Sequence, residues 1–225
     1  MKDQLVKAWR FLYRRGFIEG FGHLSVRLPG TDQYLLTRHS LGPRATPDDF
    51  LVMDLEGRKV AGAGDPPGEF PIHQEIYRAR PDVGSVVHYH GMYSTAFTTS
   101  EHTLKPIHGT ATIFHDGIPV YPDPRLISTR QRGEALAKAL GARRAVLLRA
   151  HGAAITGPDL RETVGSAFLF EQNAQRACIS AGLGRPLWLE GQLAADTAAE
   201  QLKGGGMFRR VWALVESDSE ETSSG

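Results

Sequence analysis

The chain has 225 residues, of which 41% are hydrophobic and 23% charged, and its formal net charge at pH 7 is +1. This composition is typical of a globular domain with a full hydrophobic core, and the lack of a Lys/Arg block argues against nucleic acid or an anionic membrane as partner. No apolar run approaches the roughly 20 residues of a transmembrane helix, and the single cysteine, Cys178, favours a reducing, cytoplasmic compartment.

The first part of the chain predicts one helix followed by two β-hairpins. Apolar residues recur at helical spacing over residues 5–13, and Gly16 follows as a C-terminal cap. Strand-like stretches then come in two pairs, each joined by turn-forming residues: 24–28 with 34–37, and 50–54 with 59–61.

The second part predicts helices around two further strands. The helices are expected at 69–80, 126–140, 159–181, 193–202 and 208–215, and the strands at 83–90 and 145–148. Residues 216–225 are rich in Ser and Glu and predict a disordered acidic tail, which leaves residues 1–215 as one domain. Helices flanking a mixed, mainly antiparallel set of strands predict an α/β domain of layered type.

Between the two predicted hairpins lies the polar loop Arg38-His39-Ser40-Leu41-Gly42-Pro43-Arg44. One interpretation is a solvated turn. The other is an anion-binding loop, because arginine forks match carboxylate or phosphate oxygens. The residues alone leave both interpretations open.

His88-Tyr89-His90 falls in a predicted strand, where residues two apart project from one face, so both imidazoles can reach one ion. An isolated pair of this kind is more often structural. However, His151 follows another short strand, and Glu69 opens the predicted helix before His88, where a helix N-terminus stabilises a carboxylate. Three imidazoles with a carboxylate or water are typical of an open catalytic site for one divalent ion: Zn, Mn, Fe or Co. His73, four residues after Glu69, is a candidate to face the same site.

Four segments of the chain resemble the class II aldolase/adducin family. In order, 21–27 is similar to its Gly-Asn-x-Ser-x-Arg strand, 67–73 with 80–82 to its glutamate helix and Arg-Pro-Asp turn, 86–90 to its paired-histidine strand, and 151–157 to its third histidine. The resemblance spans about residues 5–181. It implies a three-layer α/β/α fold with a mixed, mainly antiparallel central sheet, and a homotetramer with active sites at subunit interfaces. It also implies a divalent metal on His88, His90 and His151, with Glu69 as the catalytic glutamate.

Departures from the sugar-phosphate aldolases of this family concern the phosphate site. Pro67-Gly68 stands where those enzymes have serines before the glutamate, His23 replaces their asparagine, and Thr37-Arg38-His39-Ser40 replaces their phosphate loop. We therefore expect a carboxylate rather than a phosphate to be bound, with Arg38, Ser40, Arg44, His23 and His73 as substrate-binding candidates. Segments 38–47 and 121–127 resemble the decarboxylase branch, which acts on hydroxylated aromatic or hydroxy-oxo dicarboxylic acids.

The resulting hypothesis is a metal-dependent carbon–carbon lyase that decarboxylates such an acid through a metal-stabilised enolate, with Glu69 or a water moving the proton. Three alternatives stay open. The first is an aldolase that cleaves an unphosphorylated hydroxy-oxo acid, the second is a non-haem iron oxygenase, and the third is a non-catalytic module of the adducin kind. Retention of all three histidines and Glu69 argues against the third.

Overall fold

One mixed sheet runs through the centre of the chain in the computed structural model, which describes residues 1–221. Its strand order is β4-β3-β2-β1-β5-β8-β7-β6, and within the described chain every pairing is antiparallel apart from that of β6 with β7. The strands are β1 (His23–Arg27), β2 (Gln33–Thr37), β3 (Phe50–Asp54), β4 (Lys59–Ala61), β5 (Ser85–Tyr89), β6 (Val120–Tyr121), β7 (Ala145–Leu148) and β8 (Gly152–Gly157).

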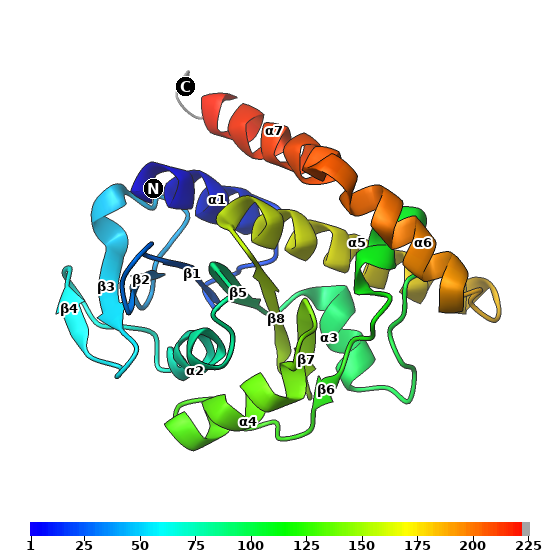
Figure 1. Cartoon of the computed structure of the whole chain (residues 1–225), viewed down its shortest axis with the longest axis horizontal. Coiled ribbons are helices and arrows are strands. Elements are labelled where there is room, and N and C mark those ends of the chain that lie inside the picture. The colour runs from blue at the N-terminus through cyan, green and yellow to red at the C-terminus, as the bar shows by residue number, and fades with distance from the viewer. Residues whose placement is uncertain (222–225) are drawn as a thin grey trace.

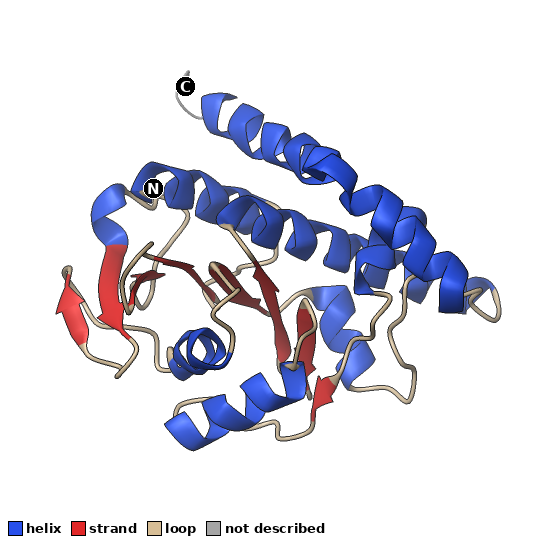
Figure 2. Cartoon of the chain, in the orientation of Figure 1, coloured by secondary structure: helices blue, strands red, loops and turns tan. Residues whose placement is uncertain are grey.

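Helices cover both faces of this sheet (Figures 1 and 2). The α-helices are α1 (Lys2–Arg14), α2 (Pro71–Ala79), α3 (Met92–Thr98), α4 (Arg130–Leu140), α5 (Leu160–Leu183), α6 (Gly191–Leu202) and α7 (Gly206–Glu221), with short 3-10 turns at Pro47–Asp49, Gly109–Phe114 and Lys203–Gly205. Helices α1, α5 and α7 lie on one side, and α2 and α4 on the other. The expected three-layer α/β/α arrangement with a mainly antiparallel sheet is confirmed.

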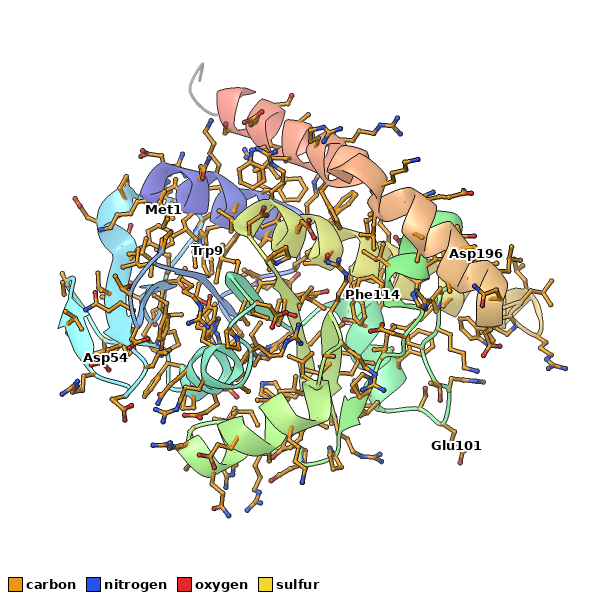
Figure 3. The ribbon with its side chains drawn as sticks, viewed as in Figure 1. Met1, Trp9, Asp54, Glu101, Phe114 and Asp196 are labelled. Atoms are coloured by element: carbon orange, nitrogen blue, oxygen red, sulfur yellow. The ribbon has the colours of Figure 1, made fainter. Side chains whose placement is uncertain are left out.

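The alternation of side chains along β5 divides the core into two clusters. Val87 and Tyr89 join the cluster formed with α1, α5 and α7, whereas Val86 joins the cluster formed with α2 and α4. His88 alternates with Val87 and Tyr89 and therefore points to the α2 face. In Figure 3, Trp9 and Phe114 lie within the body of the protein, and both are 1% exposed.

The predicted end of the first helix is confirmed, whereas the helix predicted from residue 126 begins only at Arg130. Helix α1 ends at Arg14, and Gly16 has a φ of 71° just beyond it. The Thr129 side chain accepts from the backbone N–H of Arg132 at the start of α4. The Thr129 contact satisfies one of the backbone N–H donors that the start of a helix leaves without a partner. In the described chain, no helix combines the length and apolar character required to span a membrane.

Among the described strands and α-helices, β6, β8 and α3 were not predicted. The sequence predicted no strand after His151, but Gly152–Gly157 forms β8, which lies between β5 and β7. The small residues of β8 have a low strand propensity, so the sequence did not indicate a strand. Close packing accounts for at least one of them, because a Cβ at Gly157 would lie 2.8 Å from the Thr163 hydroxyl. Helix α3 follows the paired histidines and was also missed.

The expected disordered tail is wrong as far as Glu221, because α7 continues to that residue. Within α7, the Trp212 indole N–H donates to Glu216 at 3.0 Å, and Arg15, just beyond α1, pairs with Asp218 at 3.3 Å. The ion pair with Arg15 connects the helix extension to the N-terminal part of the protein. The rest of the predicted tail, residues 222–225, lies outside the described residues.

Candidate metal centre

Four side chains converge at one end of the central strands. His88 and His90 come from β5 and its end, His151 comes from the turn between β7 and β8, and Glu69 precedes α2. Their ligand atoms all lie within 4.8 Å of one another. The Nε2 atoms of His88 and His90 are 3.1 Å apart, and Glu69 Oε2 lies 3.3 Å from His151 Nε2 and 3.8 Å from His88 Nε2. The sequence-predicted ligand set is thus brought together within one chain.

The turn that carries His151 is held tightly against β5. The His151 N–H donates to the Leu148 carbonyl, and Ala150 has a φ of +51°, a conformation that non-glycine residues rarely adopt. The following Gly152 has no room for a side chain, since a Cβ there would lie 2.3 Å from the Tyr89 carbonyl oxygen. The glycine therefore lets the His151 turn approach the strand that carries His88 and His90.

The hydrogen bonding of His88 orients its ring for metal binding. His88 is fully buried, and its Nδ1 lies 3.0 Å from the Ala153 carbonyl oxygen, which can only accept. Nδ1 must then carry the proton, which leaves the Nε2 lone pair directed toward the other ligands. Burial, followed by the neighbouring His23, lowers the pKa of His88 well below its ordinary value. The ring is neutral, which is the form that binds a metal.

His151 provides a direct test of whether a cation fits this site. Its Nδ1 and Nε2 are both buried, and among the described residues neither makes a well-directed hydrogen bond, although Nε2 lies 3.3 Å from Glu69 Oε2. Buried polar atoms are normally satisfied, so an orphaned imidazole nitrogen facing a carboxylate and two further imidazoles indicates a missing partner. A divalent ion matches this donor set of three nitrogens and one carboxylate oxygen.

Glu69 is held in its ionised form. Burial would raise its pKa, but the His151 side chain, the nearby His88 and the Ile127 backbone N–H hold it at about 2. The Ile127 N–H donates to Glu69 Oε1 at 2.7 Å. Glu69 lies before Phe70, the N-cap of α2, so the expectation that it stands in the first turn of that helix is wrong. The carboxylate is stabilised by an amide from the segment before α4 instead.

His23 and His73 form a buried chain of polar groups next to the ligands. His23 Nδ1 lies 2.6 Å from His73 Nε2, and His73 Nδ1 lies 2.6 Å from the Ser25 hydroxyl, which in turn is 2.7 Å from the Tyr77 hydroxyl. The His23 ring centroid is 4.9 Å from that of His88. Burial, followed by His88, lowers the pKa of His73 to about 3. The structure therefore places both predicted histidines at the cluster as neutral rings.

The arginine loop divides between two places. The Arg38 Nε donates to Asp49 at 2.7 Å, and the next residue, His39, donates its N–H to the Asp65 carbonyl, in the loop that leads to Glu69. Arg44 instead lines a cleft of about 630 Å³ beside α1, together with Arg10 and Arg14 of that helix. Arg44 thus lies beside α1, on the face of the sheet opposite α2, whereas Arg38 is paired with Asp49, and the substrate-binding role of each stays a prediction.

Ser40 follows Arg38 in this loop and adopts a strained conformation. Its φ is +56°, and its hydroxyl lies 2.7 Å from His39 Nδ1. Ser40 is exposed, so its hydroxyl remains accessible at the rim of the loop.

A buried carboxylate that the sequence analysis missed supports the turn after His90. Glu171 of α5 accepts backbone N–H groups from Tyr93 at 2.8 Å and Ser94 at 3.2 Å, and burial raises its pKa. A Cβ at Gly91 would meet the same carboxylate. The helical pattern of residues 159–181 predicted the helix that carries Glu171. It gave no indication that this acidic side chain would be buried.

Comparisons with known proteins agree with this geometry. Residues 3–178 match the family described as Class II Aldolase and Adducin N-terminal domain. A 3,4-dihydroxyphthalate decarboxylase from Terrabacter sp. (strain DBF63) is 31% identical over 217 residues, which are 89% of this chain and 87% of that protein. A 4-hydroxy-3-prenylphenylpyruvate oxygenase/4-hydroxy-3-prenylbenzoate synthase from Streptomyces roseochromogenus subsp. oscitans is 38% identical over 51% of this chain and 43% of its own length.

A solved structure extends the comparison to the aldolases. The l-fuculose-1-phosphate aldolase from Thermus thermophilus superposes with a TM-score of 0.69 at 29% identity, over 82% of this chain and 97% of that one. The decarboxylase and the aldolase are both lyases, which confirms the expected enzyme class and the resemblance to the decarboxylase branch. The fold, the converging histidines and the match over residues 3–178 agree, and the chain belongs to the class II aldolase and adducin family.

Proposed function

We propose that the chain is a metal-dependent decarboxylase of a hydroxylated aromatic carboxylic acid, with a dicarboxylic acid as the preferred substrate. The observation that carries this proposal is the cluster of three imidazoles and one ionised carboxylate beside two neutral histidines. Its support among relatives is the decarboxylase that aligns over 89% of the chain. The substrate named for that relative, 3,4-dihydroxyphthalate, has the hydroxyl and carboxyl groups that such a site would recognise.

In this proposal His88, His90 and His151 hold one divalent ion: Zn, Mn, Fe or Co. When bound, the ion would supply a positive charge that stabilises electrons left on the substrate as carbon dioxide departs. A site with protein ligands on one side keeps a position open for the substrate oxygens.

Glu69 is proposed as the group that moves the proton. A carboxyl group with a pKa of about 2 is deprotonated at neutral pH, so Glu69 begins the reaction as a proton acceptor rather than as an acid. It can take the proton of the substrate hydroxyl and return it to the ring carbon that loses the carboxylate. The balance is one proton taken up for each carbon dioxide released, since a C–H bond replaces the C–C bond.

His23 and Arg38 are proposed to bind the substrate carboxylates. His23 Nδ1 is engaged with His73, which leaves Nε2 as the nitrogen free to donate to a ligand. The rings of His23 and His73 are both neutral. They can therefore donate hydrogen bonds to a negatively charged substrate without adding a second positive charge next to the metal ion. Arg38 has one nitrogen fixed by Asp49, which orients the rest of its guanidinium at the rim, beside Ser40.

Carbon dioxide release tests this proposal. Purified protein is stripped with a chelator, reloaded separately with each metal, and assayed with 3,4-dihydroxyphthalate and with dihydroxybenzoates. We expect release that depends on metal and is lost by at least about 100-fold in Glu69→Gln, with metal content unchanged. The variant His88→Ala should lose both metal and turnover. Retention of both in His88→Ala would disprove the proposed centre.

Aldol cleavage is the second candidate, favoured by the structural similarity to an l-fuculose-1-phosphate aldolase. It uses the same charge stabilisation but releases a carbonyl compound, so product analysis separates the two reactions. An oxygenase reaction, the activity named for one relative, is distinguished by oxygen uptake with ferrous iron. We also propose a homotetramer, which light scattering of the purified protein would test.

A further inference from the structure

Phe21 is an exposed aromatic residue next to the candidate metal centre. Its side chain is 71% exposed, whereas Phe17 and Ile18 of the same loop are 8% and 0% exposed. The Phe21 ring lies nearly parallel to that of the metal-ligand candidate His90, with an interplanar angle of 23° and ring centroids 6.0 Å apart. The loop therefore buries its first aromatic ring and presents its second beside a ligand.

The position of Phe21 is fixed by contacts on both sides. Gly22, the next residue, has a φ of +111°, and a Cβ there would lie 2.8 Å from the His88 carbonyl oxygen. On the other side, the Phe17 ring stacks on Tyr89 at 5.4 Å and 21°. Both anchors are on β5, the strand that carries the paired histidines, so the Phe21 backbone is held relative to the cluster.

The cluster is closed on its inner side. His88 and His73 are 0% exposed and His23 is 4% exposed, whereas His90 is only partly buried. Glu69 and His151 are partly buried as well, so the cluster is open on the side that these three residues share, and a ligand that enters beside His90 meets the Phe21 ring. Two aromatic rings in an offset or tilted arrangement attract each other beyond the effect of the area they bury, and a saturated ring of the same size lacks this additional attraction.

We propose that Phe21 forms an aromatic wall at the mouth of the candidate metal centre and selects ligands whose hydroxyl and carboxylate groups are carried on an aromatic ring. This inference rests on the proposed function and names the residue that would recognise the aromatic ring of its substrate. It assigns to Phe21 a role in specificity, separate from the ligands and from Glu69.

A matched pair of ligands tests the role of Phe21 without relying on turnover. The probes are 2-hydroxybenzoate and 2-hydroxycyclohexanecarboxylate, which carry the same two groups on an aromatic and on a saturated ring. Their binding to zinc-loaded protein is measured by calorimetry for wild type, Phe21→Ala, Phe21→Leu and Phe21→Tyr. Leu187→Ala, at a side chain that is 83% exposed, is the surface control.

We expect Phe21→Ala to weaken 2-hydroxybenzoate binding about 5- to 10-fold, with less than a twofold change for the saturated probe and unchanged zinc content. Phe21→Leu should resemble Phe21→Ala, whereas Phe21→Tyr and Leu187→Ala should resemble wild type. The inference is overturned if both probes weaken equally, if neither changes, if wild type binds neither, or if zinc is lost. It is also overturned if Phe21→Ala changes the oligomeric mass but not the ratio of the two affinities. Absence of carbon dioxide release would contradict the proposed decarboxylation but would leave this binding ratio measurable.

Discussion

Gly152 offers a sharp test of how the backbone shapes the candidate metal centre. An alanine Cβ at this position would lie 2.3 Å from the Tyr89 carbonyl oxygen and 2.8 Å from Cδ2 of His90. Bringing the first contact to 3.0 Å requires a shift of about 0.7 Å. Overpacking of this kind costs about 1–3 kcal/mol of folding stability. Displacements near 1 Å at a functional group reduce its performance by about 100-fold, so we expect Gly152→Ala to weaken zinc binding by about 10- to 100-fold.

Gly84 provides the matched control for this substitution. A Cβ there would lie 2.1 Å from the Pro158 carbonyl oxygen, but Gly84 precedes β5 at the end of the strand away from His88 and His90. Gly84→Ala should therefore lose similar stability in urea unfolding yet bind zinc as wild type does in competition with a chromophoric chelator. The reasoning is refuted if both variants lose zinc affinity equally, or if Gly152→Ala is destabilised but binds zinc normally.

Three further predictions concern stability. Arg27 donates to the carbonyls of Val83 at 3.1 Å, Tyr77 at 2.6 Å and Arg80 at 3.3 Å, so Arg27→Ala should cost about 3 kcal/mol in chemical unfolding, and Arg27→Lys clearly less. An equal loss in both variants would contradict this account. Burial lowers the pKa of His108 to about 4, so the unfolded state binds more protons between pH 6.5 and 4. His108 should contribute about 1–2 kcal/mol, after allowance for solvent screening, to the loss of stability as pH falls through this window, and His108→Asn should reduce the slope by that share. Finally, chelator treatment should lower the melting temperature and added divalent metal should restore it, whereas His151→Ala should show no such response in calorimetry.

The ligand residues could be predicted because simple periodic rules govern them. His88 and His90 are two apart at a strand, which sets their common side, and that rule does not depend on distant contacts. The order of the strands and the position of Arg44 depend on packing between segments far apart in sequence. The loop that carries Arg44 turns toward α1, where the Arg10 side chain donates to the Ala45 carbonyl at 2.7 Å. No local pattern distinguishes this path from one toward Glu69.

The boundaries that differed from prediction have the same origin. Residues 216–221 have a composition typical of disorder, but an ion pair between Arg15 and Asp218 connects positions 203 residues apart. Strand β8 has few of the branched residues that favour strands. Its formation depends on backbone pairing with β5 on one side and β7 on the other. Glu171 is a comparable case, since its partners are the amides of a helix that was itself not predicted.

The central location of the histidines has a kinetic consequence. His88 and His90 belong to β5 and its end, and His151 adjoins β8, and these two strands lie inside the sheet, whereas β4 and β6 form its edges. Fraying of an edge strand would leave the converging side chains in place, because opening usually begins where fewest contacts are lost. An ion bound there would link chain segments more than 60 residues apart. Its release should therefore be slow, because it would require β5 and β8 to separate. Amide hydrogen exchange of those strands would then slow in step with metal retention.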